Sequence, residues 1–180
     1  MTRKMQGNAW VFEGLLEVDQ ELCPFDITRK LRDQGITQTF EVMGKYAMIG
    51  IDPDFPKKVQ KGDFIVAGEG MGYGHDHYHA CKAIRGAGVA AILCESTNAN
   101  FLRNCIDHGL PIIECRGVTD LVRQGDKLEV DLEAGKVKNL GSGAGLEFSP
   151  FPEFILEMLD AGGVYSQLEQ QLKSGKLSYT

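Results

Sequence analysis

The sequence has few of the features that mark membrane, secreted or nucleic-acid-binding proteins. No apolar run approaches the length of about 20 residues that a membrane-spanning helix needs, so we expect no membrane insertion. The basic residues among the first six are not followed by an apolar stretch, so they do not form a secretory signal, and we expect a cytoplasmic protein. The net charge of −6 argues against a nucleic-acid partner, since such proteins normally present a basic surface.

Cysteine pairs are also missing. The five cysteines are odd in number and none belongs to a CxxC motif, which argues against a disulfide framework and against a complete set of ligands for an iron–sulfur cluster. We expect buried free thiols at Cys23, Cys81, Cys94, Cys105 and Cys115.

Strand-like and helix-like segments alternate along the chain. The run 64–67 is short, apolar and followed by glycine, which is typical of a buried strand, and 89–94 and 110–115 are similar. A helix over 98–107 separates the last two, and alternation at this spacing predicts an α/β fold with parallel pairing. We further expect strands over 9–16 and 37–42, a hairpin over 127–140, a flexible link over 141–145 and C-terminal helices within 152–174. Without internal repeats, residues 1–180 are expected to form one domain.

The most informative segment is the glycine-rich loop over 68–80. Glycines at alternate positions permit positive φ and close backbone approach to a ligand, and three histidines at alternate positions follow them. Asp76 can cap a helix that runs over roughly 77–85, and a glycine loop before a helix N-terminus suits an anion. Titratable side chains gathered there make this loop the candidate functional site.

Several blocks, in order over nearly the whole chain, give the sequence a resemblance to a known family: Ile51-Asp52-Pro53-Asp54-Phe55, Gly62-Asp63, Ile65-Val66-Ala67-Gly68-Glu69, Gly86-Ala87-Gly88-Val89, Gly109-Leu110-Pro111, Pro152-Glu153-Phe154 and Ala161-Gly162-Gly163. The sequence resembles the small subunit of 3-isopropylmalate dehydratase, the swivelling domain of the aconitase superfamily. The resemblance implies a three-layer β/β/α domain with a mixed sheet. It also implies a large partner subunit that carries a [4Fe-4S] cluster, in a heterodimer or heterotetramer, and a hydro-lyase or isomerase reaction on a 2-hydroxy carboxylic acid.

The resemblance fails in part at the loop itself. The family sequence Gly-x-Gly-Ser-Ser-Arg-Glu-His-Ala keeps only Gly72, Gly74, His79 and Ala80 here. His75 replaces the serine that acts as base, and imidazole needs little activation for that role. Asp76 replaces the second serine. His77 replaces the arginine that grips a substrate carboxylate, which removes a planar bidentate donor.

These changes lead us to expect catalytic roles for His75 and Asp76, and substrate contacts from Gly72, Gly74 and His77. We infer a substrate other than isopropylmalate, with replacement positive charge from Arg29 and Lys30 in the predicted helix that starts at Asp26.

Two alternatives stay open. The first is a metal-binding module built from the loop histidines with Asp76 and Cys81, although a helix that starts at Asp76 would separate those side chains. The second is a degenerate scaffold that binds a partner without catalysis. We expect His79 to be a packed, hydrogen-bonded residue, and Tyr73 and Tyr78 to be wall or core residues.

Overall fold

The computed structural model describes residues 3–176, and its centre is a seven-stranded mixed sheet with the order β4-β3-β2-β1-β5-β6-β7. Four strands run parallel to one another: β1 (Lys4–Phe12), β2 (Phe64–Ala67), β3 (Ala91–Cys94) and β4 (Ile112–Glu114). The rest form an antiparallel extension: β5 (Lys127–Asp131), β6 (Lys136–Asn139) and β7 (Gly145–Glu147).

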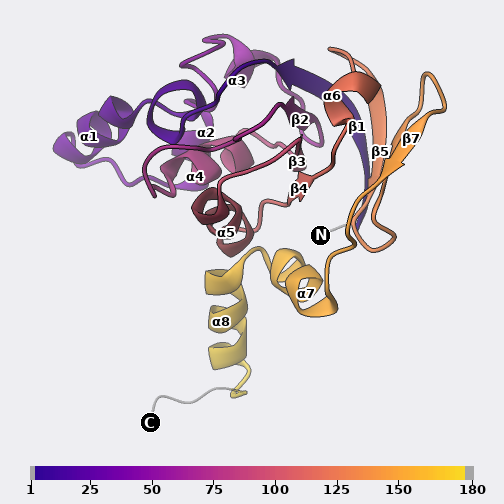
Figure 1. Ribbon diagram of the computed structural model, residues 1–180. Helices are drawn as coiled ribbons and strands as arrows, with labels where there is room; N and C mark the ends of the chain where they lie inside the picture. The colour runs from indigo at the N-terminus through magenta and orange to yellow at the C-terminus, as the bar shows by residue number, and fades with distance from the viewer. Residues whose placement is uncertain (1–2, 177–180) are drawn as a thin grey trace.

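Both faces of the parallel strands are buried, because successive side chains of a strand point to opposite sides. Ile65 and Ile92 belong to the core under the helices α1 (Phe25–Asp33), α2 (Phe40–Gly44), α4 (His79–Gly86) and α5 (Ala99–Asp107). Phe64 and Leu93 belong to a second core, shared with Leu128 and Val130 of β5. The antiparallel extension therefore curls over the second face, and the result is the expected three-layer β/β/α arrangement with a mixed sheet (Figure 1).

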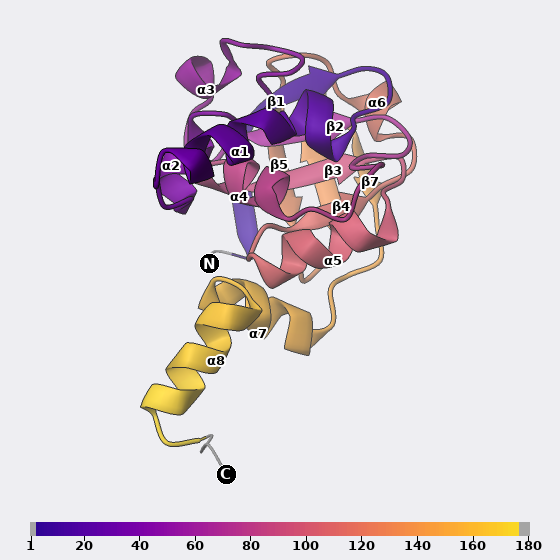
Figure 2. The same ribbon diagram turned by 90° about the vertical axis from the view of Figure 1, so that its left-hand side faces the viewer.

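The remaining helices lie at the margins. They are α3 (Phe55–Lys58), α6 (Val118–Leu121), α7 (Glu153–Ala161) and α8 (Val164–Lys173). Leu156 and Leu159 of α7 reach the second core, whereas α8 contains no buried residue. In two perpendicular views α8 projects away from the body of the molecule (Figures 1 and 2).

One predicted strand has different bounds, and two predicted elements are wrong. The strand expected over 9–16 begins earlier, as β1, and ends at Phe12, because Gly14 turns the chain with a φ of 84°. The strand expected over 37–42 is absent, and α2 begins at Phe40 because the Thr39 side chain accepts a hydrogen bond from the backbone N–H of Val42. The segment 141–145 is not a flexible link, because it forms the turn that pairs β7 with β6.

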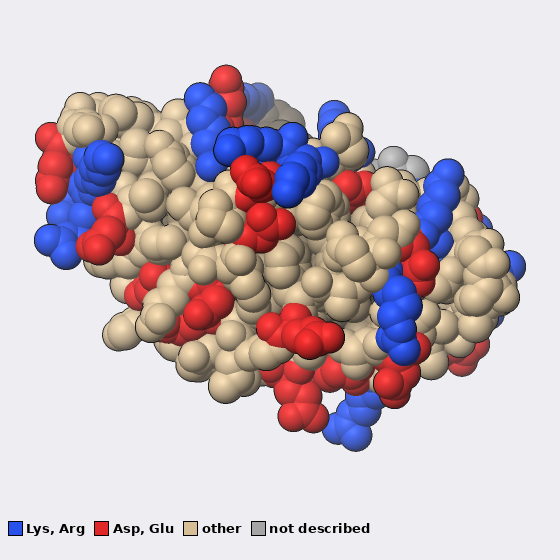
Figure 3. Space-filling view, turned by 90° about the horizontal axis from the view of Figure 1, so that it is seen from above, with Lys and Arg blue, Asp and Glu red and all other residues tan. Residues whose placement is uncertain are grey.

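On the face that Figure 3 shows, acidic and basic side chains lie beside each other in small groups. Among the described residues, no helix has the length and apolar content that a membrane crossing requires.

Candidate active site

The glycine-rich loop connects β2 to α4 and is fixed from both sides. On one side the backbone N–H of Gly72 donates to the Leu16 carbonyl at 2.9 Å, and that of Val18 donates to the Tyr73 carbonyl at 3.0 Å. On the other side the N–H of Gly70 donates to Ser96 Oγ at 3.0 Å. The loop therefore lies between the segments 16–18 and 96–98, at the carboxyl ends of parallel strands, where α/β sheets commonly form sites.

The glycines serve close packing against two side chains. Gly74 has a φ of 100°, and a Cβ atom there would lie 2.6 Å from Glu17 Oε1. Gly72 has a φ of 73°, and a Cβ atom would lie 2.1 Å from the Phe101 ring. Positive φ is therefore confirmed at both positions. Their predicted contact with substrate is not tested, since the neighbours seen are Glu17 and Phe101.

Asp19 brings the histidines of the loop together. It lies in a short π-helical turn, Val18–Leu22, and its side chain is 13% exposed. Nδ1 of His77 lies 2.9 Å and 3.0 Å from the two carboxylate oxygens, and Nδ1 of His75 lies 3.3 Å from Oδ2. A carboxylate only accepts hydrogen bonds, so this arrangement favours a proton on Nδ1 of both rings and leaves each Nε2 for other partners.

Ring stacking holds the same histidines in place. The Phe25 ring stacks on His77 with centroids 4.7 Å apart and an angle of 11°, and His77 stacks on His75 at 5.6 Å and 14°. The exposed fraction of the side chain rises from 39% at His77 to 75% at His75. The outer imidazole is therefore oriented by its neighbours and open to solvent.

Glu17 is an unusual neighbour of this stack. Its side chain is only 10% exposed, Oε1 lies 3.9 Å from Nδ1 of His75, and Oε2 is a buried oxygen that finds no hydrogen-bond partner among residues 3–176. A buried carboxylate is costly unless a positive charge or a proton compensates it. A protonated His75 would provide that compensation.

His79 is the packed residue that we expected. It is 5% exposed, Nε2 donates to the Cys23 carbonyl at 2.8 Å, and burial lowers the pKa of its imidazole. Since Nε2 carries that proton, it has no lone pair for a metal.

Asp76 differs from the prediction. It does not cap the helix, because α4 begins only at His79 with Tyr78 as its N-cap residue. The segment 75–78 is not helical, and within it the side chains of His75 and His77 contact Asp19. Asp76 Oδ1 accepts a hydrogen bond from Asn104 of α5 at 2.8 Å. Tyr73 and Tyr78 are 39% and 54% exposed, so they are not core residues.

Arg29 and Lys30 are on the exposed side of α1. Arg29 pairs with Asp26 at 3.2 Å, and among the described residues neither side chain contacts the loop histidines. Their proposed role in substrate binding stays a prediction.

All five cysteines are buried free thiols, as expected. Burial raises the pKa of Cys23 and Cys94 to about 12, which disfavours the thiolate that iron requires as ligand. The described residues contain no group of three cysteines placed to hold a metal ion. This chain therefore does not fit a [4Fe-4S] cluster by itself.

The sequence prediction missed Glu17 and Phe25, and gave Asp19 no role. A signal existed for two of them, since Glu17 and Asp19 lie in the acidic segment 17–21, whereas Phe25 follows Pro24. What was not visible was the parallel bridge between Glu17 and Tyr73, which sets that segment beside the loop.

Comparisons with known proteins agree with the resemblance. No protein-family model matches the chain. The isopropylmalate/citramalate isomerase small subunit of Methanocaldococcus jannaschii is 45% identical over 132 residues, which cover 73% of this chain and 79% of that protein. The 3-isopropylmalate dehydratase small subunit 1 of Methanopyrus kandleri is 38% identical over 93% of this chain and 94% of its own length. The crystal structure of a 3-isopropylmalate dehydratase from M. jannaschii superposes with a TM-score of 0.83 at 30% identity, over 97% of this chain and 99% of that one.

Proposed function

This chain belongs to the family of 3-isopropylmalate dehydratase small subunits, hydro-lyases that act with a large subunit, and from this premise we propose how its altered loop works. The loop forms the small-subunit half of a site for a 2-hydroxy carboxylic acid. The large subunit carries the [4Fe-4S] cluster, which when bound supplies the Lewis acid for the leaving hydroxyl group. The assembly is cytoplasmic, and its stoichiometry is a heterodimer or a heterotetramer.

The observation that carries the proposal is the contact of Asp19 with Nδ1 of both loop histidines. With Nδ1 facing a carboxylate, Nε2 of His75 has a lone pair and is exposed, as a general base requires. His75 takes the proton from C3 of the substrate, beside the carbon that bears the hydroxyl group; the C–H electron pair forms the double bond as the hydroxide leaves from C2. Asp19 and Glu17 then stabilise the imidazolium that forms.

His77 takes the place of the family arginine. With Nδ1 on Asp19, His77 has a single ring nitrogen, Nε2, for a substrate carboxylate, whereas a guanidinium offers two parallel donors. We therefore propose a 2-hydroxy acid other than isopropylmalate as the substrate. Gly72 and Gly74 let the substrate approach the backbone. Asp76 is the second catalytic group, and the hydrogen bond from Asn104 holds its carboxylate in place.

The test is made on the complex with the large subunit, purified without oxygen and screened for alkene formation from 2-hydroxy acids. His75→Ala should lower turnover by about 10²–10⁴-fold, the usual contribution of a general base, while the complex still forms. Asp76→Asn tests the second predicted catalytic group. Glu169→Gln is the control, because this exposed residue of α8 lies outside the loop and pairs with Lys173. Unchanged turnover in His75→Ala removes His75 from the mechanism.

One observation favours a second candidate, a metal site. Ligand atoms of Glu17, Asp19 and His75 lie within 4.8 Å of one another, and Glu17 has the unpartnered oxygen. This set differs from the one expected from the sequence, because Asp76 turns to Asn104 and Cys81 lies against Cys105 in the core. A metal on Nδ1 of His75 excludes the proton there, so the two candidates exclude each other. One equivalent of zinc retained after dialysis, and lost in Glu17→Gln, would favour the metal site.

A further inference from the structure

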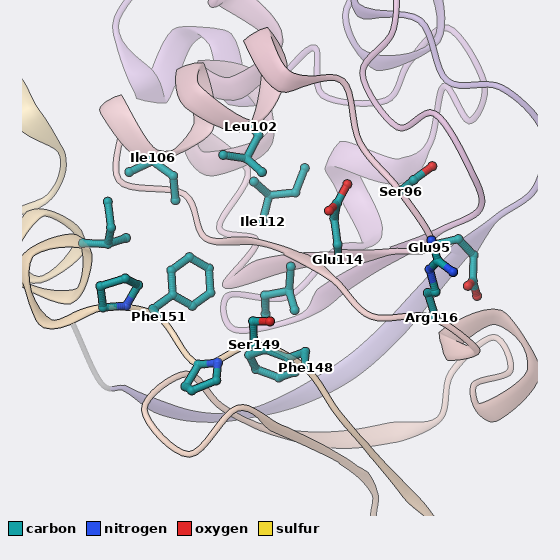
Figure 4. A pocket seen from close by; sticks show the side chains of 14 residues that line it. Glu95, Ser96, Leu102, Ile106, Ile112, Glu114, Arg116, Phe148, Ser149 and Phe151 are labelled. Atoms are coloured by element: carbon teal, nitrogen blue, oxygen red, sulfur yellow. The ribbon is translucent and has the colours of Figure 1, made fainter.

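A cavity of about 670 Å³ lies at the carboxyl ends of β3 and β4, separate from the loop histidines. None of the residues 72–80 lines it. One wall comes from α5 and β4, and the opposite wall from the segment 148–152 and α7 (Figure 4). Its volume is in the range of small-molecule sites, and the carboxyl ends of parallel strands are the usual place for such a site.

The cavity has an apolar end and a charged end. Ile106, Ile112 and Phe151 form the apolar end, whereas Glu114 and Arg116 lie toward the other end beside Glu95 and Ser96 (Figure 4). A ligand that fills it therefore needs an apolar body and a charged head.

The two free charges at the head are of opposite sign. Glu114 is the last residue of β4 and Arg116 lies in the turn that follows, and both line the cavity. Among the described residues no ion pair joins Arg116 to any carboxylate. Glu114 uses Oε1 to accept the Thr97 N–H at 2.8 Å, and Oε2 has no partner there.

Glu95 adds negative charge at this end of the cavity, but its oxygens are already occupied by protein donors. Its oxygens accept hydrogen bonds from the N–H groups of Gly117 and Thr119 and from the Thr119 hydroxyl. Burial raises the pKa of Glu95, but these hydrogen bonds outweigh it and lower the pKa overall. One carboxylate oxygen and one guanidinium are left, which matches an ammonium group and a carboxylate on the same small molecule.

We propose that this cavity binds a free α-amino acid with an apolar side chain. The ammonium group contacts Glu114, the carboxylate contacts Arg116, and the side chain lies between Ile106, Ile112 and Phe151. The site is independent of the proposed catalytic role of the loop, so either proposal can fail alone.

The test uses the full chain and isothermal titration with L-leucine, L-methionine and L-phenylalanine. Saturable one-to-one binding is expected. It should weaken at least tenfold in Arg116→Gln and in Glu114→Gln, since hydrogen bonds to charged groups contribute on the order of one to two powers of ten in affinity. Arg103→Gln is the matched control, because this exposed arginine of α5 does not line the cavity and pairs with Asp107 instead. Circular dichroism shows whether each variant is folded.

Two leucine analogues complete the test. 4-Methylpentanoate lacks the ammonium group and 3-methylbutylamine lacks the carboxylate, so both should bind at least tenfold more weakly than leucine. Equal binding of either analogue, or no binding of any of the three amino acids at 20 mM, overturns the proposal. Binding that the free chain shows and the complex with the large subunit loses also overturns it, and assigns the cavity to the subunit interface.

Discussion

The Asp19 carboxylate contacts Nδ1 of His75 and of His77, and Nε2 of His79 lies 3.6 Å from its Oδ1, so its substitution tests the orientation of the site more directly than loss of a histidine does. Asp19→Asn keeps the size of the side chain but replaces one acceptor oxygen with a donor, which cannot pair with Nδ1–H of both rings. We expect kcat of the complex to fall by about 10²-fold or more, with a smaller change in KM, because a misoriented base still permits substrate binding.

Asp54→Asn is the control for Asp19→Asn, since Asp54 is an exposed carboxylate outside the loop and pairs with Lys57 and Lys58. If Asp19→Asn turns over substrate at the normal rate, the histidines do not depend on Asp19. In that case the contacts at 2.9–3.3 Å serve only the fold.

Asp63 contributes to the stability of the fold rather than to the proposed function. It is 2% exposed and accepts four hydrogen bonds, two from Asn8 and one each from the Trp10 indole and the Gln60 N–H. Burial raises the pKa of Asp63, but the hydrogen bonds outweigh it and the pKa is lowered overall. The stabilisation is therefore complete above the unfolded pKa of about 3.9 and is lost as the pH falls through the lower folded value.

Asp63→Asn should consequently reduce the free energy of unfolding at pH 7 by about 1–3 kcal/mol, since donors around residue 63 lose acceptors. The difference from the unsubstituted chain should narrow below about pH 4. Urea unfolding at the two pH values measures both effects. A difference that is independent of pH would show that the ionised carboxylate is not what stabilises this corner.

At the scale of elements, α2 and α4 pack through two glycines. A Cβ atom on Gly44 would lie 2.4 Å from the backbone carbon of Gly86, so any side chain would separate the helices. Gly44→Ala should lower the free energy of unfolding by several kcal/mol, at least as much as other overpacking substitutions in cores. It should also move α4 away from the loop that precedes it. Differential scanning calorimetry measures the loss. Gly35→Ala is a comparison without steric conflict, since no atom lies within 4 Å of that Cβ position, although its φ of 68° adds strain.

The same packing explains which elements were predictable. The strands β2, β3 and β4 are buried on both faces and appear in the sequence as apolar runs, so the parallel sheet was predicted. The strands β5 and β6 alternate between exposed and buried residues, so their hairpin was also predicted. The segment 37–42 also alternates between apolar and polar residues, but from Phe40 it forms the start of α2. The Thr39 cap and the packing of Gly44 against Gly86, 42 positions further along the chain, stabilise that helix. In the candidate site, the loop residues were predicted from the sequence. Glu17 and Phe25 were not, because only contacts with residues far along the chain, Tyr73 and His77, bring them to the site.

At the scale of the whole molecule, the partner should cover the loop side rather than α8. Leu15 is 61% exposed and lies beside the base of the loop, since a Cβ atom on Gly70 would be 3.2 Å from Leu15 Cδ2, and Tyr73 and Tyr78 are exposed on the loop itself. Exposed apolar side chains in one area indicate an interaction surface. A site that is shared between two subunits also requires the open imidazole of His75 to face the large subunit.

Leu15→Glu should therefore weaken the complex with the large subunit at least tenfold, as substitution of a central interface residue does, without loss of fold. Leu168→Glu is the matched control, because Leu168 is 43% exposed on α8, which projects away from the body (Figure 2). Analytical ultracentrifugation of the mixed subunits gives the affinity, and circular dichroism of the free chain gives the fold. The opposite result, assembly lost in Leu168→Glu and kept in Leu15→Glu, would place the large subunit on α8 and leave His75 facing solvent.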